Sequence, residues 1–203
     1  MSSIRVRNGK ALQDPRIARA LLSNPIAGLF WLPLRVWLGW QWLESGWGKI
    51  SNPAWTQTGE ALKGYWTNAV MIPEAGRPPI AFDWYRGFVQ TLLDAQAWPW
   101  FSKLVVAGEV LVGVALILGA FTGFAAFFGG LMNWNFMMAG SASVNPVFFV
   151  ISVGLILAWK VAGHFGLDYF LLARLGAPWK DRSDESPTSG EPRPQRETVR
   201  AST

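Results

Sequence analysis

Residues 34–50, LRVWLGWQWLESGWGKI, decide the fold of this chain. The stretch is almost wholly apolar and aromatic, yet it contains two cations and one carboxylate. On a helix of about 100° per residue, one sector roughly 80° wide collects Arg35, Gly39, Trp42, Gly46 and Lys49. A soluble core helix rarely buries an arginine among tryptophans, whereas a membrane helix turns its glycines and charges toward neighbouring helices. The stretch therefore predicts the first span of a membrane bundle with a polar interior.

The composition supports a membrane protein. The 203 residues are 51% hydrophobic and 15% charged, against about 25% charged in an ordinary soluble domain. Thirteen tryptophans suit the aromatic belts at membrane interfaces. The net charge of +5 is spread over the flanks, which favours membrane topology signals over a nucleic-acid surface. The absence of cysteine excludes thiol chemistry in this chain, and a single histidine leaves too few ligands for most zinc or haem sites.

The sequence predicts an all-α fold, namely a polytopic membrane four-helix bundle. Apolar runs of suitable length predict spans at about 26–47, 101–120, 124–138 and 145–161 within a bundle of residues 25–172. Residues 1–24 are a basic flank with a short amphipathic turn, and residues 173–203 read as a largely disordered tail. Cations in both flanks favour a cell (inner) membrane protein with both termini in the cytoplasm.

Residues 51–100 form a long outer loop that is too polar to span and too aromatic to be disordered. Two short interfacial helices are expected, at 53–66 and 83–96, with Asp83 as the N-cap of the second. The proline-rich segment 73–79 predicts a turn between them. We expect this loop to lie as an aromatic cap over the outer end of the bundle.

Charged residues at mid-membrane are costly when unpaired, by at least about 2.5–3.5 kcal/mol. Arg35 and Glu109 fall at similar depths in the first and second spans, so the sequence predicts that they pair. Two interpretations stay open: a staple that only orients two helices, or part of a polar intramembrane pocket. The pocket would comprise Arg35, Glu109, Lys49, Asn133 and Glu44, with an aromatic lining or lid from Trp42, Trp134, Trp84 and Phe88. Space for it would be left by Gly39, Gly46, Gly113 and Gly130.

Two polar features near the span ends complete the candidate set. Asn133 and Asn135 point about 200° apart on a helix, so only one of them readily faces the bundle centre, where bonding to another helix is expected. His164 and Asp168 are one turn apart, which favours a local tether over a proton relay.

In combination, these residues resemble the DoxX/DoxD family of four-span membrane proteins. The likeness rests on Arg35, Gly39, the Glu44-Ser-Gly46-Trp-Gly48-Lys49 segment, Gly108-Glu109 followed by Gly113 and Gly119, the glycine-rich third span, and Gly163-His-Phe-Gly-Leu-Asp168. The long outer connection is similar to the DoxD branch, described as the membrane subunit of a thiosulfate:quinone oxidoreductase. The resemblance implies quinone-linked sulfur oxidation or a membrane-bound oxidative-stress complex, but no established set of catalytic residues.

Two functions of different classes follow from this resemblance. As a redox subunit, the chain would bind a quinone through Arg35, Asn133 or Glu109, with Trp42 or Trp134 against the ring. Thiosulfate would be attracted from outside by Lys49, Lys63 or Lys103. No cofactor motif is recognisable, so electrons would pass directly to quinone or through a partner oxidoreductase subunit. The alternative is a non-catalytic membrane anchor or assembly subunit. A third and weaker hypothesis is transport of a small molecule through a homo-oligomer.

Overall fold

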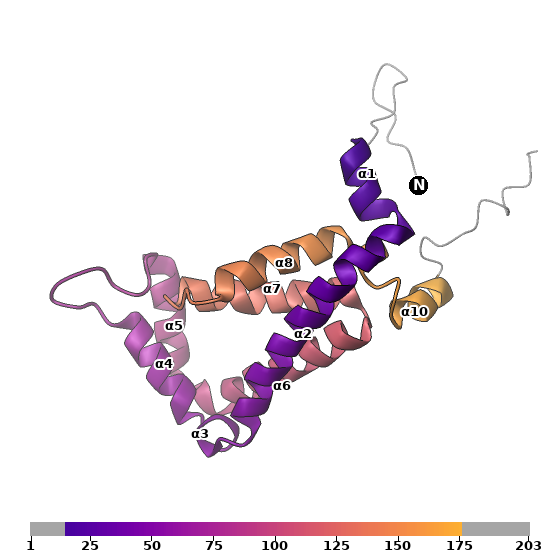
Figure 1. Cartoon of the computed structure of the whole chain (residues 1–203). Helices are drawn as coiled ribbons and strands as arrows, with labels where there is room; N and C mark the ends of the chain where they lie inside the picture. Colours follow the sequence, from indigo (N-terminus) through magenta and orange to yellow (C-terminus); the bar gives the residue numbers. More distant parts are fainter. Residues whose placement is uncertain (1–14, 176–203) are drawn as a thin grey trace, which may run out of the picture.

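The computed structural model describes residues 15–175, and every regular element in that part of the chain is helical (Figure 1). Four helices are long: α2 (Gly28–Ile50), α6 (Trp98–Leu118), α7 (Thr122–Met138) and α8 (Asn145–Leu157). The remaining elements are short: α1 (Arg16–Ser23), the 3₁₀ turn η1 (Pro25–Ala27), α3 (Pro53–Thr56), α4 (Glu60–Val70), α5 (Asp83–Asp94), α9 (Trp159–Ala162) and α10 (Asp168–Arg174). The predicted all-α class is confirmed. The tail expected to be disordered, residues 173–203, lies outside the described residues except for residues 173–175.

Helices α2 and α6 pack closely because glycines line their contact. A Cβ atom on Gly39 would lie 2.9 Å from the carbonyl oxygen of Gly113, and one on Gly113 would lie 2.6 Å from the Leu43 amide nitrogen. A Cβ atom on Gly46 would lie 2.7 Å from a methyl of Val110. The glycines therefore bring the two backbones together, and the expectation that they leave space for a pocket is wrong here.

The second layer of the bundle is the pair α7 and α8. Figure 1 shows this pair diverging from α2 and α6 toward the end where the loop helices lie. The common core of the four helices consists of large apolar residues such as Leu38, Trp42, Leu116, Phe148 and Leu155. Small residues of α7, Ala125 and Ala126, are buried in the same core and allow this close packing.

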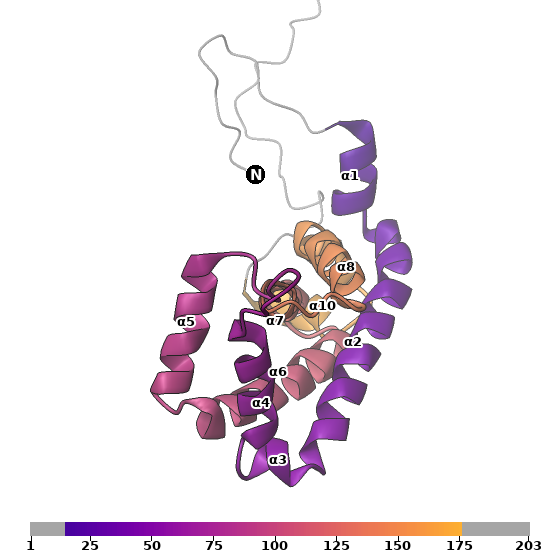
Figure 2. The same ribbon diagram turned by 90° about the vertical axis from the view of Figure 1, so that its left-hand side faces the viewer.

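Residues 51–97 form the cap, which joins the two diverging layers (Figures 1 and 2). Its helices have their own apolar core, including Leu62, Trp66, Tyr85 and Val89. The single helix expected at 53–66 is instead two helices, α3 and α4. The break is at Gly59, which has φ +76° and lies so close to Trp98 that a side chain would collide with the Trp98 carbonyl.

The second cap helix matches the prediction more closely. Helix α5 begins at Asp83, but the N-cap is Phe82 and no side chain bonds the first turn, so the predicted Asp83 cap is wrong by one residue. Asp83 pairs instead with Arg86, at 2.6 Å between Oδ1 and Nη1. The proline-rich segment between α4 and α5 is non-helical, as predicted.

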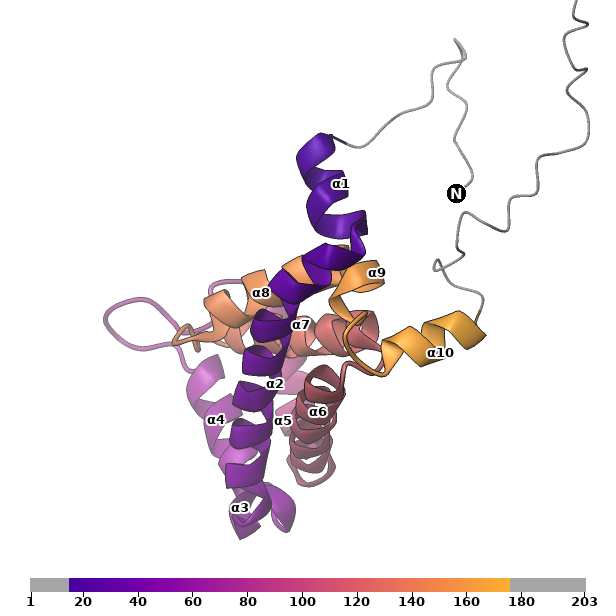
Figure 3. The ribbon, with the colours of Figure 1, turned by 45° about the vertical axis from the view of Figure 1, so that its right-hand side comes forward.

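The opposite end of the bundle carries α1, α9 and α10 (Figure 3). Within the described residues, α6 alone is long and apolar enough to cross a membrane by itself. A second candidate is the pair formed by α1 and residues Pro25–Ile50, which is bent by 66°, and α8 is a shorter apolar helix. Length and composition therefore identify one clear span rather than four.

Candidate functional site

Arg35 is anchored at the end of the bundle opposite the cap. Its guanidinium donates to the carbonyl oxygens of Ala162 (3.0 Å) and Phe165 (3.1 Å), at the end of α9 and in the turn after it. The side chain is 1% exposed. Gly119 and Gly166 make room for it, since a Cβ atom on either residue would collide with the guanidinium. Arg35 therefore joins α2 to the 163–167 turn.

Asp168 completes this polar end of the bundle. Its carboxylate accepts hydrogen bonds from the backbone N–H groups of Phe121 (2.5 Å) and Thr122 (2.8 Å), at the start of α7. A carboxylate at a helix N-terminus is favoured because the first N–H groups have no partner within the helix. Asp168 is also close enough to attract the Arg35 guanidinium. The role of Asp168 as a cap for α7 was not anticipated from the sequence.

Lys49 and Glu109 form the second charged contact, nearer the cap. Lys49 Nζ lies 2.9 Å and 2.8 Å from the two carboxylate oxygens of Glu109. Nζ also donates to the Ser45 hydroxyl at 2.8 Å and lies 5.2 Å from the ring centre of Trp55. The Glu109 side chain is 1% exposed, whereas that of Lys49 is 21% exposed. The pair therefore joins α2 to α6 with its cation toward the surface.

The predicted Arg35–Glu109 pair is wrong. Helices α2 and α6 run antiparallel, and their register places Gly39 against Gly113 and Gly46 against Val110. This register brings Lys49 to Glu109 and leaves Arg35 beside Gly119, more than two helical turns away along α6. Carbonyl oxygens at the end of the bundle then accept hydrogen bonds from the two terminal nitrogens of Arg35, Nη1 and Nη2.

Glu44 does not share this interior. It is exposed, on the side of α2 that faces away from α6, so it does not join the buried charges. Lys63 has a carboxylate partner of its own, at 3.3 Å from Glu60, and lies 4.8 Å from the ring centre of Trp98. Lys103 is exposed. Of the three lysines expected to attract an anion, Lys49 and Lys63 are thus already paired with carboxylates.

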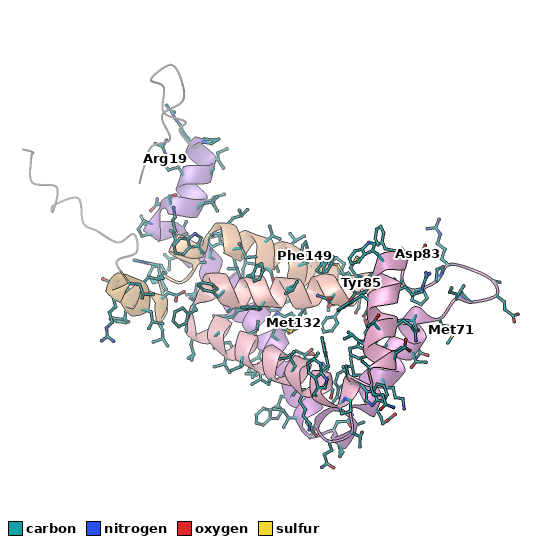
Figure 4. All side chains as sticks on the ribbon, turned by 180° about the vertical axis from the view of Figure 1, so that it is seen from behind. Arg19, Met71, Asp83, Tyr85, Met132 and Phe149 are labelled. Carbon is teal, nitrogen blue, oxygen red and sulfur yellow. The ribbon has the colours of Figure 1, made fainter. Side chains whose placement is uncertain are left out.

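A cavity of about 470 Å³ lies between the cap and helices α6 and α7. Its walls are overwhelmingly apolar, from residues on α4, α5, α6 and α7. In Figure 4, the labelled Tyr85 of α5 and Met132 of α7 both lie beside this space. The lining includes Leu62, Trp66, Phe88, Leu92, Phe101, Leu104, Val105, Gly108, Leu111, Val112, Phe128, Leu131, Met132 and Phe136.

The polar groups at the edge of this cavity come from two tyrosines and one asparagine. The Tyr85 hydroxyl donates to Asn135, with the backbone oxygen at 3.1 Å and Oδ1 at 3.0 Å. The Tyr65 hydroxyl donates to the Phe136 carbonyl at 3.4 Å. Burial raises the pKa of Tyr85 to about 12, with a further contribution from Tyr65. Burial also raises the pKa of Tyr65. Both tyrosines therefore stay neutral and tie the cap to the end of α7.

The four predicted aromatic residues occupy three different places. Phe88 lines the cavity, as a lid residue would. Trp84 and Trp134 stack on one another with ring centres 6.4 Å apart, and neither lines the cavity. Trp42 is buried in the bundle core beside Phe136 and Phe148. No sequence pattern indicated that Tyr65 and Tyr85 would lie at the cavity, although both lie within the aromatic loop predicted to cap the bundle.

The two asparagines of α7 differ as expected. Asn133 is fully buried in the bundle, while Asn135 lies at the cavity and its amide also donates to the Leu131 carbonyl at 2.8 Å. The expected bond from Asn133 to another helix is absent: neither its nitrogen nor its oxygen has a partner among residues 15–175. Trp42 Nε1 and Ser152 Oγ are buried without partners in the same part of the chain.

Known proteins provide one relevant comparison. The DoxX family model matches residues 30–139, which is more than half of the chain. Searches of curated proteins and of solved structures give no match. The matched segment contains α6, the glycine contact between α2 and α6, and the Lys49–Glu109 pair. All regular elements in the described part are helices, and this chain belongs to the DoxX family of membrane-associated proteins.

Proposed function

We propose that this DoxX-family chain is a multi-pass subunit of the cell (inner) membrane that binds a quinone in the cavity beneath its cap. Both termini would lie in the cytoplasm, and the cap would lie outside. The subunit would belong to a quinone-linked oxidoreductase of the thiosulfate:quinone type. The observation that carries this proposal is the apolar cavity of about 470 Å³ between α4, α5, α6 and α7.

The size and lining of the cavity suit a quinone ring. Small-molecule sites commonly have volumes of about 300–1,000 Å³, apolar walls and a few polar groups that orient the ligand. Phe88, Phe101, Phe128 and Phe136 provide flat apolar walls, and the Tyr65, Tyr85 and Asn135 groups provide the polar edge.

The outward faces of the long helices support a position within the lipid. Large apolar side chains are exposed along all four of them, where a soluble protein would carry polar groups. These residues include Leu29, Trp37, Trp40, Val114, Leu118, Phe124, Phe127, Val147, Val150 and Leu157. Helices α2, α6, α7 and α8 would then be the spans, with the α8 span completed by α9.

Sulfur chemistry would take place on a partner subunit. The chain has no cysteine, so it forms no persulfide or mixed disulfide of its own. Lys49 and Lys63 are each neutralised by a carboxylate, which weakens the expected attraction of thiosulfate to this surface. The contribution of this chain would be to hold the quinone and to contact the subunit that delivers electrons.

Purification in mild detergent, followed by solvent extraction and chromatography, tests the proposal. We expect close to one quinone per chain. Gly108 lines the cavity, and a side chain there would point at Met132, whose sulfur is 3.2 Å from the Cβ position. Gly108→Leu should therefore lose most of the quinone. Gly64→Leu, on α4 where a Cβ atom meets nothing within 4 Å, is the matched control. Equal quinone content in the two variants would overturn the proposal.

The alternative, a non-catalytic anchor or assembly subunit, is favoured by a different observation. The buried charges of α2 and α6 are all engaged in helix-to-helix contacts: Arg35 with carbonyls, and Lys49 with Glu109. An anchor would need no more than this. A purified complex that contains a partner protein, but no quinone in either the unaltered chain or the Gly64→Leu control, would support the anchor.

A further inference from the structure

We propose that Trp42, Asn133 and Ser152 form a polar site behind the cavity wall that binds one oxygen atom of the quinone ring. The proposal rests on the proposed function and adds to it the residues that hold the reacting end of the ligand. All three side chains are buried, with exposed fractions of 3%, 0% and 0% respectively. Their polar atoms Trp42 Nε1, Asn133 Nδ2 and Oδ1, and Ser152 Oγ have no partner among the described residues.

Two consecutive glycines of α7 bring these groups together. A Cβ atom on Gly129 would lie 3.1 Å from Trp42 Nε1, so the indole N–H of α2 lies against Gly129. A Cβ atom on Gly130 would lie 3.2 Å from Ser152 Cβ and 3.9 Å from its Oγ, so the hydroxyl of α8 lies against Gly130. At this turn of α7, which carries no side chains at residues 129 and 130, α2 therefore contributes an N–H donor and α8 contributes a hydroxyl.

Asn133 is one turn further along the same helix. Residues three and four apart share a face, and helical side chains lean back over the preceding turn. Asn133 therefore shares a face of α7 with Gly129 and Gly130, the glycines against which Trp42 and Ser152 pack. Three polar groups thus belong to this part of the bundle: an N–H donor, a hydroxyl, and an amide that both donates and accepts.

The site adjoins the cavity behind Val112 and Met132. Val112 lines the cavity, and its Cγ1 lies 3.1 Å from the same Gly129 Cβ position that Trp42 Nε1 approaches. Met132, next to Asn133 in the chain, also lines the cavity. If Val112 or Met132 changed its side-chain conformation, one oxygen of a quinone ring in the cavity would therefore come within reach of the three groups. Methionine is flexible enough to allow such a movement.

The chemistry fits a quinone oxygen in both of its redox forms. A carbonyl oxygen accepts hydrogen bonds from Trp42, Ser152 and the Asn133 amide nitrogen. The hydroxyl of the reduced ring would donate to the Asn133 amide oxygen. A buried polar group without a partner is destabilising, so four such atoms are costly in the empty protein and gain partners when the oxygen binds.

Equilibrium binding of decylubiquinone to the protein in lipid nanodiscs tests this site. The variants are Asn133→Leu, Trp42→Phe and Ser152→Ala, each of which removes the polar atoms and keeps most of the volume. Each should weaken binding by about 3- to 10-fold, the expected loss for one neutral hydrogen bond. The thermal midpoint of the ligand-free protein should stay unchanged or rise, because a buried group without a partner has been removed.

Thr122→Val is the matched control. Its hydroxyl is also buried and without a partner among residues 15–175, but it lies at the other end of α7. This variant should bind decylubiquinone as tightly as the unaltered chain. If Asn133→Leu lowers the thermal midpoint without ligand and leaves the affinity unchanged, the site binds a structural water molecule and the proposal is overturned.

The cavity variant separates this inference from the proposed function. If Gly108→Leu abolishes binding while Asn133→Leu, Trp42→Phe and Ser152→Ala all bind normally, the cavity holds the quinone but these three groups do not. If the unaltered chain fails to bind decylubiquinone at all, both proposals fail.

Discussion

Arg35 and Lys49 lie on the same face of α2 and end in different kinds of contact. Arg35 is hydrogen-bonded to neutral carbonyls at the end of α9 and in the turn after it, and Lys49 to a single buried carboxylate. A guanidinium presents several donors in a fixed plane and suits two carbonyls, whereas an ammonium is a compact charge that suits one carboxylate. Both residues act as connections between helices, so changes at either are expected to affect stability first.

Removal of one partner of the Lys49–Glu109 pair should be costly. Lys49→Met leaves the Glu109 carboxylate buried and uncompensated, with an expected loss of about 3 kcal/mol in the free energy of unfolding. Combining it with Glu109→Gln should restore much of that loss, giving a coupling of about 1–3 kcal/mol in a double-mutant cycle. Thermal unfolding in detergent measures these differences.

The exposed pair Lys63–Glu60 is the control for that cycle. Its side chains are 42% and 57% exposed, and the changes Lys63→Met and Glu60→Gln should couple by no more than about 0.5–1 kcal/mol. Strict additivity at Lys49 and Glu109, equal to that of the exposed pair, would show that the buried contact contributes nothing.

Gly119 supports a second prediction at the residue scale. It has φ +65° and a Cβ atom there would collide with the Arg35 guanidinium. Gly119→Ala should therefore destabilise the protein by about 1–3 kcal/mol through backbone strain, and by more if Arg35 is displaced. Gly64→Ala, in the interior of α4 with open space around it, should stabilise by up to about 1 kcal/mol. Unchanged stability in Gly119→Ala would refute the proposed arrangement around Arg35.

At the scale of elements, glycine has two separate effects. Gly39, Gly46 and Gly113 allow α2 and α6 to approach closely. The space that a side chain would take at each glycine is occupied by backbone or side-chain atoms of the facing helix. Gly59 and Gly119 instead adopt positive φ and end or begin helices. The second effect sets the direction of the cap helices and of α7, and hence the place of the cavity.

The attachment of the cap to α7 should depend on pH. Burial raises the pKa of Tyr85 to about 12, above the value near 10 of an exposed tyrosine. The folded state therefore holds the Tyr85 proton more tightly than the unfolded state does. The stability from this neutral hydroxyl is complete below pH 10 and is lost as the pH rises from 10 through 12.

Thermal unfolding across this pH range, with absorbance titration of the phenolate, measures the effect. Tyr85→Phe should show a shallower decline in stability between pH 10 and 12. In the absorbance titration, the tyrosine that ionises at the highest pH should be absent from this variant. Tyr169→Phe is the control, because Tyr169 lies on α10 away from the cap and its removal should leave the decline unchanged. Equal declines in the Tyr85→Phe variant and the unaltered chain would contradict the assignment.

At the scale of the whole molecule, the charges separate into two ends. The end opposite the cap holds Arg35, Asp168 and the basic α1, while Lys49 and Glu109 lie toward the cap. The cap has its own core and is tied to the bundle by the two tyrosines. The molecule is therefore a bundle with one charged, closed end and one end covered by an aromatic cap.

Reporter fusions test the proposed topology. Fusions after Lys10 and after Lys180 should report a cytoplasmic location, and a fusion near Arg77, in the loop between α4 and α5, should report an external one. The pattern follows from the basic flanks and from an even number of spans between the termini. An internal signal from the Arg77 fusion would contradict both the orientation and the placement of the cap.

The sequence by itself determined the helical class, the family and the buried face of α2. The 3.6-residue period placed Arg35, Gly39, Trp42, Gly46 and Lys49 on one face; the first four are buried, and the Lys49 side chain is 21% exposed. It also separated Asn133 from Asn135, because their directions depend only on helix geometry. These features are local, and local spacing along one helix is enough to predict them.

Only the tertiary structure decided which charges meet. The depth of each residue along its helix suggested that Arg35 pairs with Glu109. The glycine contacts instead set a register in which Glu109 pairs with Lys49, and Arg35 bonds to carbonyls more than 120 residues away in the chain. The cavity likewise depends on how the cap closes over two diverging helix pairs. The register of α2 against α6 and the position of the cap are both relations between elements. Each arises from the packing of surfaces that are distant in the sequence, and no pattern within a single segment encodes it.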